Sequence, residues 1–119
     1  MNVAAYESMG LVERCARAFN DTATGATFSS SALIFEDESG PAAYVDFLME
    51  GCEAAELPGS ATTDATAIVC SAGFPIAYLV VSDGTIAQAV SAGPPAGGAF
   101  DQTALLEQAL ALIEAMPAP

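Results

Sequence analysis

The segment IAYLVVSDGTIAQAVS, residues 76–91, decides the fold of this chain. Two runs rich in β-branched and aromatic residues flank Asp83-Gly84, and this arrangement is the strongest short-range signal for a β-hairpin. We place a two-residue type I′ turn at Asp83-Gly84, which requires positive φ at both positions. The segment therefore predicts an antiparallel pair of strands around which a sheet is built.

A further strand is predicted over residues 27–35, TFSSSALIF. Phe28 and Ile34 share one face of such a strand, and Leu33 and Phe35 share the other. Apolar residues on both faces indicate a strand that is covered on both sides toward its end.

Two other segments are ambiguous. In residues 42–50 (AAYVDFLME) the alternation of Val45 and Phe47 favours a strand, whereas the spacing of Tyr44 and Phe47 would suit a short helix. We favour the strand, because aromatic and β-branched residues dominate the segment. The short apolar run at residues 65–72 (ATAIVCSA) fits a strand or a second helix equally, and its length does not decide.

Amphipathic helices are expected at both ends of the chain. Within residues 2–19, Leu11, Cys15 and Phe19 recur at every fourth position, as on one face of a helix. Near the other end, Asp101 is suited to an N-cap before a regular apolar stripe. The stripe consists of Leu105, Leu106, Ala109, Leu110, Ile113 and Met116.

Together these segments predict an α+β fold in which N-terminal and C-terminal helices pack on an antiparallel sheet. A length of 119 residues suits a single domain, residues 1–119. Hydrophobic residues make up 53% of the chain, which excludes a disordered acidic tail. Much of that content is alanine, so the core is thin, and we expect a homodimer that buries additional surface.

The charge of the chain restricts its function. Fifteen Asp and Glu oppose only Arg14 and Arg17, giving a net charge of −13, and the chain has neither lysine nor histidine. Imidazole chemistry, a lysine Schiff base, a phosphate-binding lysine and a cationic surface for nucleic acid are therefore missing. We expect a non-enzymatic protein that binds other proteins, with no cofactor.

The candidate reactive groups lack the partners that catalysis needs. Cys52 has no histidine to activate it, and the carboxylates at 36–38 lack the spacing of a calcium loop. An enzyme would depend on carboxylates or on Tyr44 and Tyr78, and nothing marks such a site. We predict no catalytic, cofactor-binding or metal-binding residue.

The cysteines and the N-terminus bear on localisation. Cys15, Cys52 and Cys70 are odd in number and form no C-x-x-C motif, so we interpret them as reduced thiols, with Cys15 and Cys70 in the core. No basic region precedes an apolar stretch at the N-terminus, and no apolar window reaches about 18 residues. We expect a cytoplasmic protein that does not insert into membranes.

Four segments resemble the class I type III secretion chaperones of Gram-negative bacteria. They are LVERCARAF (11–19), residues 27–50 followed by ELPG (56–59), SDGTIAQAVS (82–91) and FDQTALLEQALALIEAM (100–116). The resemblance implies a small acidic cytoplasmic homodimer with the order α-β-β-β-α-β-β-α, whose second helix would include residues 65–72. It also implies binding of the N-terminal segment of a secreted effector.

On this resemblance, Phe28, Ile34, Val45 and Phe47 are candidates for the client-facing strands, and they also suit an ordinary core. Two alternatives remain. A roadblock-type domain, a regulatory dimer that docks on small GTPases, has the order helix, hairpin, helix, three strands, helix. It is favoured if residues 65–72 form a strand that pairs with the Asp-Gly hairpin. The other is an inhibitor or immunity protein, including a DNA mimic, that binds a basic partner.

Overall fold

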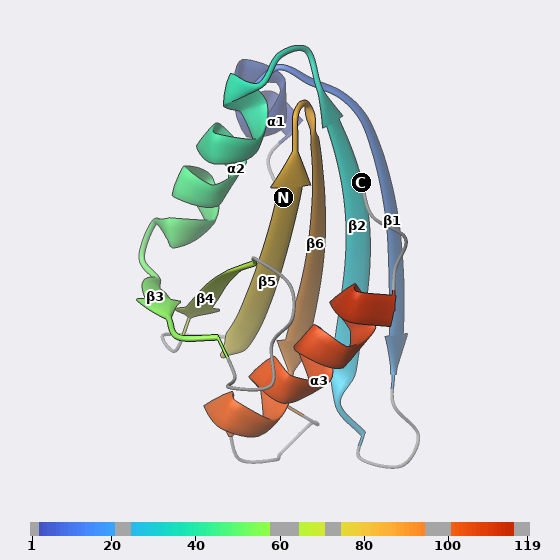
Figure 1. Ribbon diagram of the computed structural model, residues 1–119, viewed down its shortest axis with the longest axis vertical. Coiled ribbons are helices and arrows are strands. Elements are labelled where there is room, and N and C mark those ends of the chain that lie inside the picture. Colours follow the sequence, from blue (N-terminus) through green and yellow to red (C-terminus); the bar gives the residue numbers. More distant parts are fainter. Residues whose placement is uncertain (1–2, 21–24, 58–64, 71–74, 95–100, 116–119) are drawn as a thin grey trace.

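A six-stranded antiparallel sheet forms the centre of the computed structural model (Figure 1). The structure describes residues 3–20, 25–57, 65–70, 75–94 and 101–115. In chain order the elements are α1 (Val3–Ser8), β1 (Leu11–Asn20), β2 (Thr27–Phe35), α2 (Ser39–Met49), β3 (Glu53–Ala55), β4 (Thr66–Cys70), β5 (Ile76–Asp83), β6 (Ile86–Gly93) and α3 (Gln102–Ala115). The strands lie in the order β1-β2-β6-β5-β4-β3. The predicted α+β fold is confirmed.

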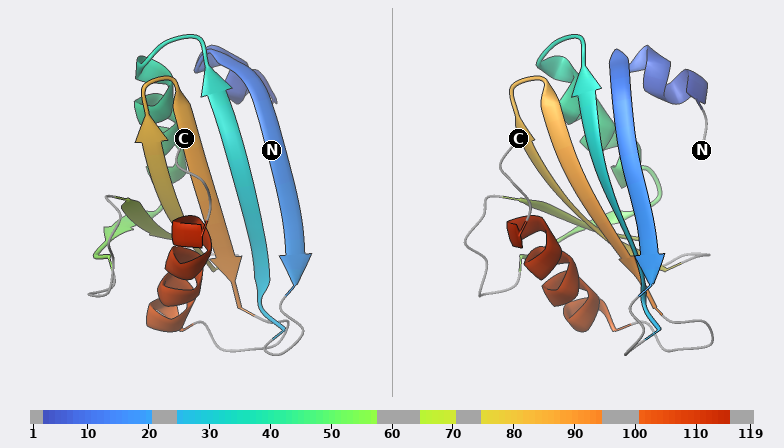
Figure 2. Two further views of the ribbon diagram at one scale, coloured as in Figure 1. Left: turned by 45° about the vertical axis from the view of Figure 1, so that its right-hand side comes forward. Right: turned by 90° about the vertical axis from the view of Figure 1, so that its right-hand side faces the viewer.

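Helices cover both faces of the sheet, and α1 and α3 lie on opposite sides of it (Figure 2). On one face, here called the α3 face, Leu106 and Leu110 of α3 pack in a cluster with Leu79 and Val90. On the other, the α2 face, α1 and α2 pack over a second cluster. Its buried members are Tyr6, Leu33, Phe35, Tyr44, Leu48, Ile68, Val80, Ala87 and Ala89.

The predicted hairpin is confirmed, and its turn lies one residue later than expected. Asp83 pairs with Ile86, so the two-residue loop is Gly84-Thr85. Gly84 has φ +61°, and no described residue other than glycine has positive φ. The turn therefore has the glycine-first pattern of type II′, not the type I′ turn that we predicted.

The predicted helix over residues 2–19 is wrong. A six-residue helix, α1, ends before Gly10, which has φ +82°, and residues 11–20 form β1. A spacing of four residues returns to the same face in a strand as well as in a helix, so the pattern of Cys15 and Phe19 does not separate the two. Pairing along β2 decides in favour of the strand.

The strand favoured for residues 42–50 is also wrong, because residues 42–49 belong to α2 and Glu50 is its C-cap. Tyr44 and Leu48, one helical turn apart, are both buried on the α2 face. The Oδ1 atom of Asp37 accepts a hydrogen bond of 2.9 Å from the Ser39 backbone N–H at the start of the helix. Gly51, with φ +74°, follows its C-cap. The acidic turn thus leads directly into a helix.

The segment at residues 65–72, left open between a strand and a helix, is a strand in its described part, so the second helix that the chaperone resemblance implied there is wrong. Residues 66–70 form β4, which pairs with β5. The α3 helix begins after Asp101, whose Oδ1 accepts a hydrogen bond of 3.1 Å from the Ala104 backbone N–H. The apolar stripe of α3 is buried as expected, apart from Met116, which lies outside the described residues.

Two of the three cysteines are not reduced thiols. Cys52 and Cys70 form a disulfide that joins the segment after α2 to the end of β4, and Cys15 is exposed, not buried. The prediction of reduced thiols is therefore wrong for Cys52 and Cys70. Disulfides persist mainly in oxidising compartments, so the cysteines no longer support the expected cytoplasmic localisation.

Candidate protein-binding surface

A cluster of tyrosines lies under α2 beside a cavity of about 190 Å³. The rings of Tyr6 and Tyr44 stack with centroids 6.2 Å apart, and the Arg14 guanidinium lies 5.6 Å from the centre of the Tyr6 ring. Burial raises the pKa of Tyr6, Tyr44 and Tyr78, and Arg14 offsets this only partly for Tyr6 and Tyr44. The phenols therefore stay protonated at neutral pH, and none is suited to act as a general base.

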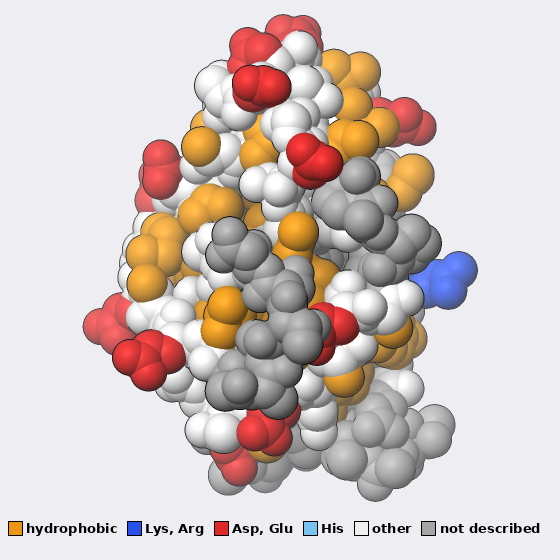
Figure 3. Space-filling model, viewed as in Figure 1, with side chains coloured by type: hydrophobic (Ala, Val, Ile, Leu, Met, Phe, Trp, Pro, Cys, Tyr) orange, Lys and Arg blue, Asp and Glu red, His pale blue; other side chains and the backbone are white. Residues whose placement is uncertain are grey.

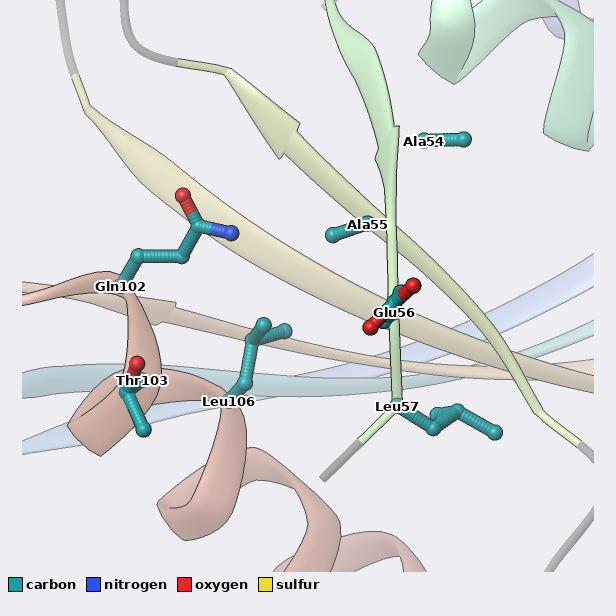
Figure 4. Close-up of a pocket in the computed structure, with 7 residues that line it drawn as sticks. All are labelled: Ala54, Ala55, Glu56, Leu57, Gln102, Thr103 and Leu106. Carbon is teal, nitrogen blue, oxygen red and sulfur yellow. The ribbon is translucent and has the colours of Figure 1, made fainter. Parts of the chain in front are cut away.

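An open groove of about 470 Å³ separates β3 from the start of α3 (Figure 4). Its lining residues are Ala54, Ala55, Glu56, Leu57, Gln102, Thr103 and Leu106. Glu56 is the only titratable group in this lining, so the groove presents neither a nucleophile with a base nor a pair of acids.

Strand β1 lies at one edge of the sheet (Figure 2), and its residues are the most exposed of any strand. It pairs with β2 on one side, and every residue after Leu11 is exposed. Val12 keeps 63% of its surface in contact with solvent and Phe19 keeps 37%. A long strand edge of this kind is a template for pairing with another chain.

Two adjoining hollows lie where the α3 face meets this edge, and together they are called the trough. The first, about 300 Å³, has small side chains of β1 and β2 in its lining, and the second, about 370 Å³, lies between Phe19 and Phe28 of the sheet and α3. The register places the two hollows one after the other on the same face. The trough is lined by Cys15, Ala16, Arg17, Phe19, Phe28, Ser30, Ser31, Ala32, Gln108, Ala111 and Leu112.

The trough combines apolar surface with one unsatisfied polar atom. The rings of Phe19 and Phe28 stack at 5.6 Å and form its lower wall. Across from them, Gln108 Oε1 is buried, and it is the only buried side-chain polar atom of the described residues without a hydrogen-bond partner. A buried acceptor in this state costs about 1–3 kcal/mol, which a donor from a bound molecule would recover.

Charge differs between this edge and the rest of the surface. Both arginines of the chain, Arg14 and Arg17, belong to β1. Figure 3 shows acidic side chains spread over the visible face, with a single basic group at the side where β1 lies. On this face the acids do not gather in one patch.

The four predicted partner-binding residues do not form one surface. Phe28 is buried against α3, where it lines the trough, and Ile34 lies half-buried on the same face of β2. Val45 and Phe47 are half-buried on α2 and pack on the opposite face. Of the trough residues, the sequence analysis predicted only Phe28 to bind a partner. For the β1 residues Cys15, Arg17 and Phe19, the available signal was their spacing of two, which places them on one face of a strand.

The chain has no match among the protein-family models, the curated proteins or the solved structures that were compared with it. Within the described residues, no three His, Cys, Asp or Glu side chains come close enough together to hold a metal ion. None of the helices in the described ranges combines the length and apolar character that crossing a bilayer requires.

Proposed function

We propose that this protein is a non-enzymatic module that binds another protein, and that an extended or helical segment of its partner occupies the trough. The observation that carries this proposal is the buried, unpartnered Oε1 of Gln108, a residue in the lining of a largely apolar hollow. Catalytic and nucleotide-binding functions have less support, because the titratable groups with shifted pKa values, apart from the exposed Asp37, are buried tyrosines on the opposite face.

The physical basis for binding is the match between apolar walls and a polar anchor. Phe19 and Leu112 offer partly exposed apolar surface, and covering it contributes roughly 25 cal/mol per Å². A backbone or side-chain N–H of the partner would donate to Gln108 Oε1, which adds direction to an otherwise non-directional contact. The negative surface elsewhere keeps the protein soluble and favours a partner that presents basic groups to the acidic surface away from β1.

The order of elements bears on the class of partner. The structure has two strands, then α2, then the remaining strands and α3, and β4 pairs with the hairpin. That pairing is the condition under which a roadblock-type regulatory module is favoured over a secretion chaperone, whose order has three strands before the second helix. A small GTPase is therefore the partner we favour, and an effector segment is the second candidate.

Affinity capture from the native host, followed by mass spectrometry, tests the proposal with two matched variants. Ala111→Arg places a long charged side chain at the rim of the trough, whereas Ala115→Arg introduces the same charge at an exposed position outside its lining. We expect Ala111→Arg to lower recovery of the partner by about tenfold or more, because the hollow is obstructed and a charge is desolvated. Ala115→Arg is expected to retain it.

The captured protein identifies the class. A small GTPase supports the roadblock-type interpretation, and a larger protein held through its N-terminal segment supports the chaperone interpretation. A basic enzyme would support the inhibitor alternative. If every captured protein is retained equally by Ala111→Arg and the unmodified protein, the trough is not the binding surface.

A further inference from the structure

We propose that β1 pairs in antiparallel orientation with β1 of a second copy of the chain, centred on Cys15, so that two sheets become one. This interface goes beyond the proposed function, because it assigns the exposed edge itself and not the trough beside it. It gives the homodimer expected from the thin core a defined geometry.

The two edges of the sheet are not equivalent. β3, at one edge, is three residues long, whereas β1, at the other, has ten. Along an edge strand, alternate residues direct their backbone N–H and C=O groups outward, where a further strand can bond to them. A register shift between Leu11 and Glu13 places a bulge at Val12, so regular pairing is available from Glu13 onward.

Side-chain charge selects one register. A two-fold axis perpendicular to the sheet keeps equivalent faces on the same side, so residues opposite each other must share a face. When Cys15 lies opposite its own copy, Glu13 faces Arg17 of the second copy, and this pair occurs twice. Opposite charges directly across an antiparallel pair of strands are stabilising.

The neighbouring registers are less favourable. Shifting by one step so that Arg14 lies on the axis places two guanidinium groups opposite each other, which is repulsive. Shifting the other way puts Ala16 on the axis and sets Glu13 against Phe19. Both alternatives lose the two Glu13–Arg17 pairs, so the register centred on Cys15 is the self-complementary one.

The distribution of charge over the chain points to the same edge. β1 contains two arginines and one glutamate, a net charge of +1, which leaves −14 for the rest of the chain. Two copies with a net charge of −13 repel each other least where they approach through β1. A second copy also brings the Glu13 and Arg17 that match those of the first.

Pairing of this kind would also enlarge the trough. The α3 faces of both copies would lie on the same side, so the two troughs would be separated only by the paired β1 strands. The small residues of the two troughs, such as Cys15 of β1 and Ala32 of β2, would then form one continuous surface between the two α3 helices.

The test is a charge swap measured by sedimentation equilibrium. Arg17→Glu opposes Glu13 to a new carboxylate, so the dimer dissociation constant is expected to rise by about tenfold or more. Glu13→Arg is expected to do the same. The double variant Glu13→Arg/Arg17→Glu restores the pairs with their signs exchanged and is expected to recover the affinity of the unmodified protein. Both residues are exposed, so circular dichroism should be unchanged in all variants.

Cys15 provides a second readout. Since Cys52 and Cys70 are bonded to each other, mild oxidation should form a covalent dimer through Cys15, because opposed residues in a strand pair have Cα atoms within disulfide range. Cys15→Ser/Ala18→Cys carries the same number of thiols and should give no covalent dimer, because position 18 lies far from its own copy in this register. A monomer at high protein concentration, or a dimer that ignores the charge swap and Cys15 oxidation, would overturn the proposal. Ala111→Arg should leave the dimer intact, so a failure of partner binding is distinguishable from a failure of dimerisation.

Discussion

Gly40 has no side chain beyond a hydrogen atom, and this allows α2 to pack closely on the sheet. It lies in the first turn of α2, and a Cβ atom built there would overlap the side chain of Phe35, a buried residue of β2. Gly40 is not in a positive-φ conformation, so close approach of the helix to the ring, and not backbone geometry, accounts for the glycine.

We therefore expect Gly40→Ala to destabilise the protein by about 1–3 kcal/mol, because the Phe35 ring must move within a packed core. Urea denaturation measures the change. In an exposed helix the same substitution would stabilise by roughly 0.5–1 kcal/mol, so the sign of the effect is diagnostic. Ala42→Gly, at an exposed position of α2, measures the difference in helix propensity between alanine and glycine without a packing effect. It should lower the free energy of unfolding by about 1 kcal/mol. A gain in stability from Gly40→Ala would contradict the packing argument.

At the scale of elements, the Cys52–Cys70 disulfide ties the end of α2 and β3 to the end of β4, across 18 residues of sequence. β3 is short and forms the edge of the sheet, so few backbone hydrogen bonds hold it. In the chain-entropy model, closing a loop of this length lowers the entropy of the unfolded chain, which stabilises the folded state by about 3 kcal/mol.

Cys52→Ser/Cys70→Ser is expected to lower the free energy of unfolding by about 2–4 kcal/mol, measured by denaturant titration. Adding a reducing agent should lower the stability of the unmodified protein by a similar amount and leave the double variant unaffected. Equal stability of the unmodified protein with and without reductant would show that the two thiols are not joined in solution.

At the scale of the whole molecule, all three tyrosines of the chain belong to one cluster on the α2 face. Burial raises the pKa of each above the ordinary value of 10.0. Between the ordinary pKa and the raised one, the unfolded chain releases protons that the folded chain keeps. Stability is therefore fully retained below pH 10 and falls as the pH rises above it.

Titration of tyrosinate absorbance measures this directly. At pH 10 the folded protein should show far less tyrosinate than the same chain in concentrated urea, and the denaturation midpoint should fall as the pH is raised further. Tyr78→Phe serves as a comparison, since it removes one titrating group and keeps the ring. Half-ionisation of the folded protein near pH 10 would mean that the phenols are exposed to solvent.

Local patterns were sufficient for part of this structure. The hairpin of β5 and β6, the two-faced strand β2 and the capped helix α3 each follow from short-range signals: a glycine turn, alternation and an N-cap with an apolar stripe. Composition alone also removed imidazole and lysine chemistry. Sequence reasoning reached the trough only through Phe28, because the small side chains at residues 30–32 of β2 carried no signal and the other residues lie on β1, interpreted as a helix, or on α3.

Tertiary structure decided the rest, for identifiable reasons. Leu11, Cys15 and Phe19 recur at a spacing common to helices and strands, and only β2, lying alongside, makes β1 a strand. Residues 42–50 have the composition of a strand, yet the space over Phe35 and beside Tyr6 accommodates a helix. The disulfide depends on Cys52 and Cys70 meeting after the chain has folded, with Cα atoms 4.5 Å apart. Sequence spacing reports the local period of an element, whereas the choice between periods, and the assembly of a surface from distant segments, is made by the packing of the whole chain.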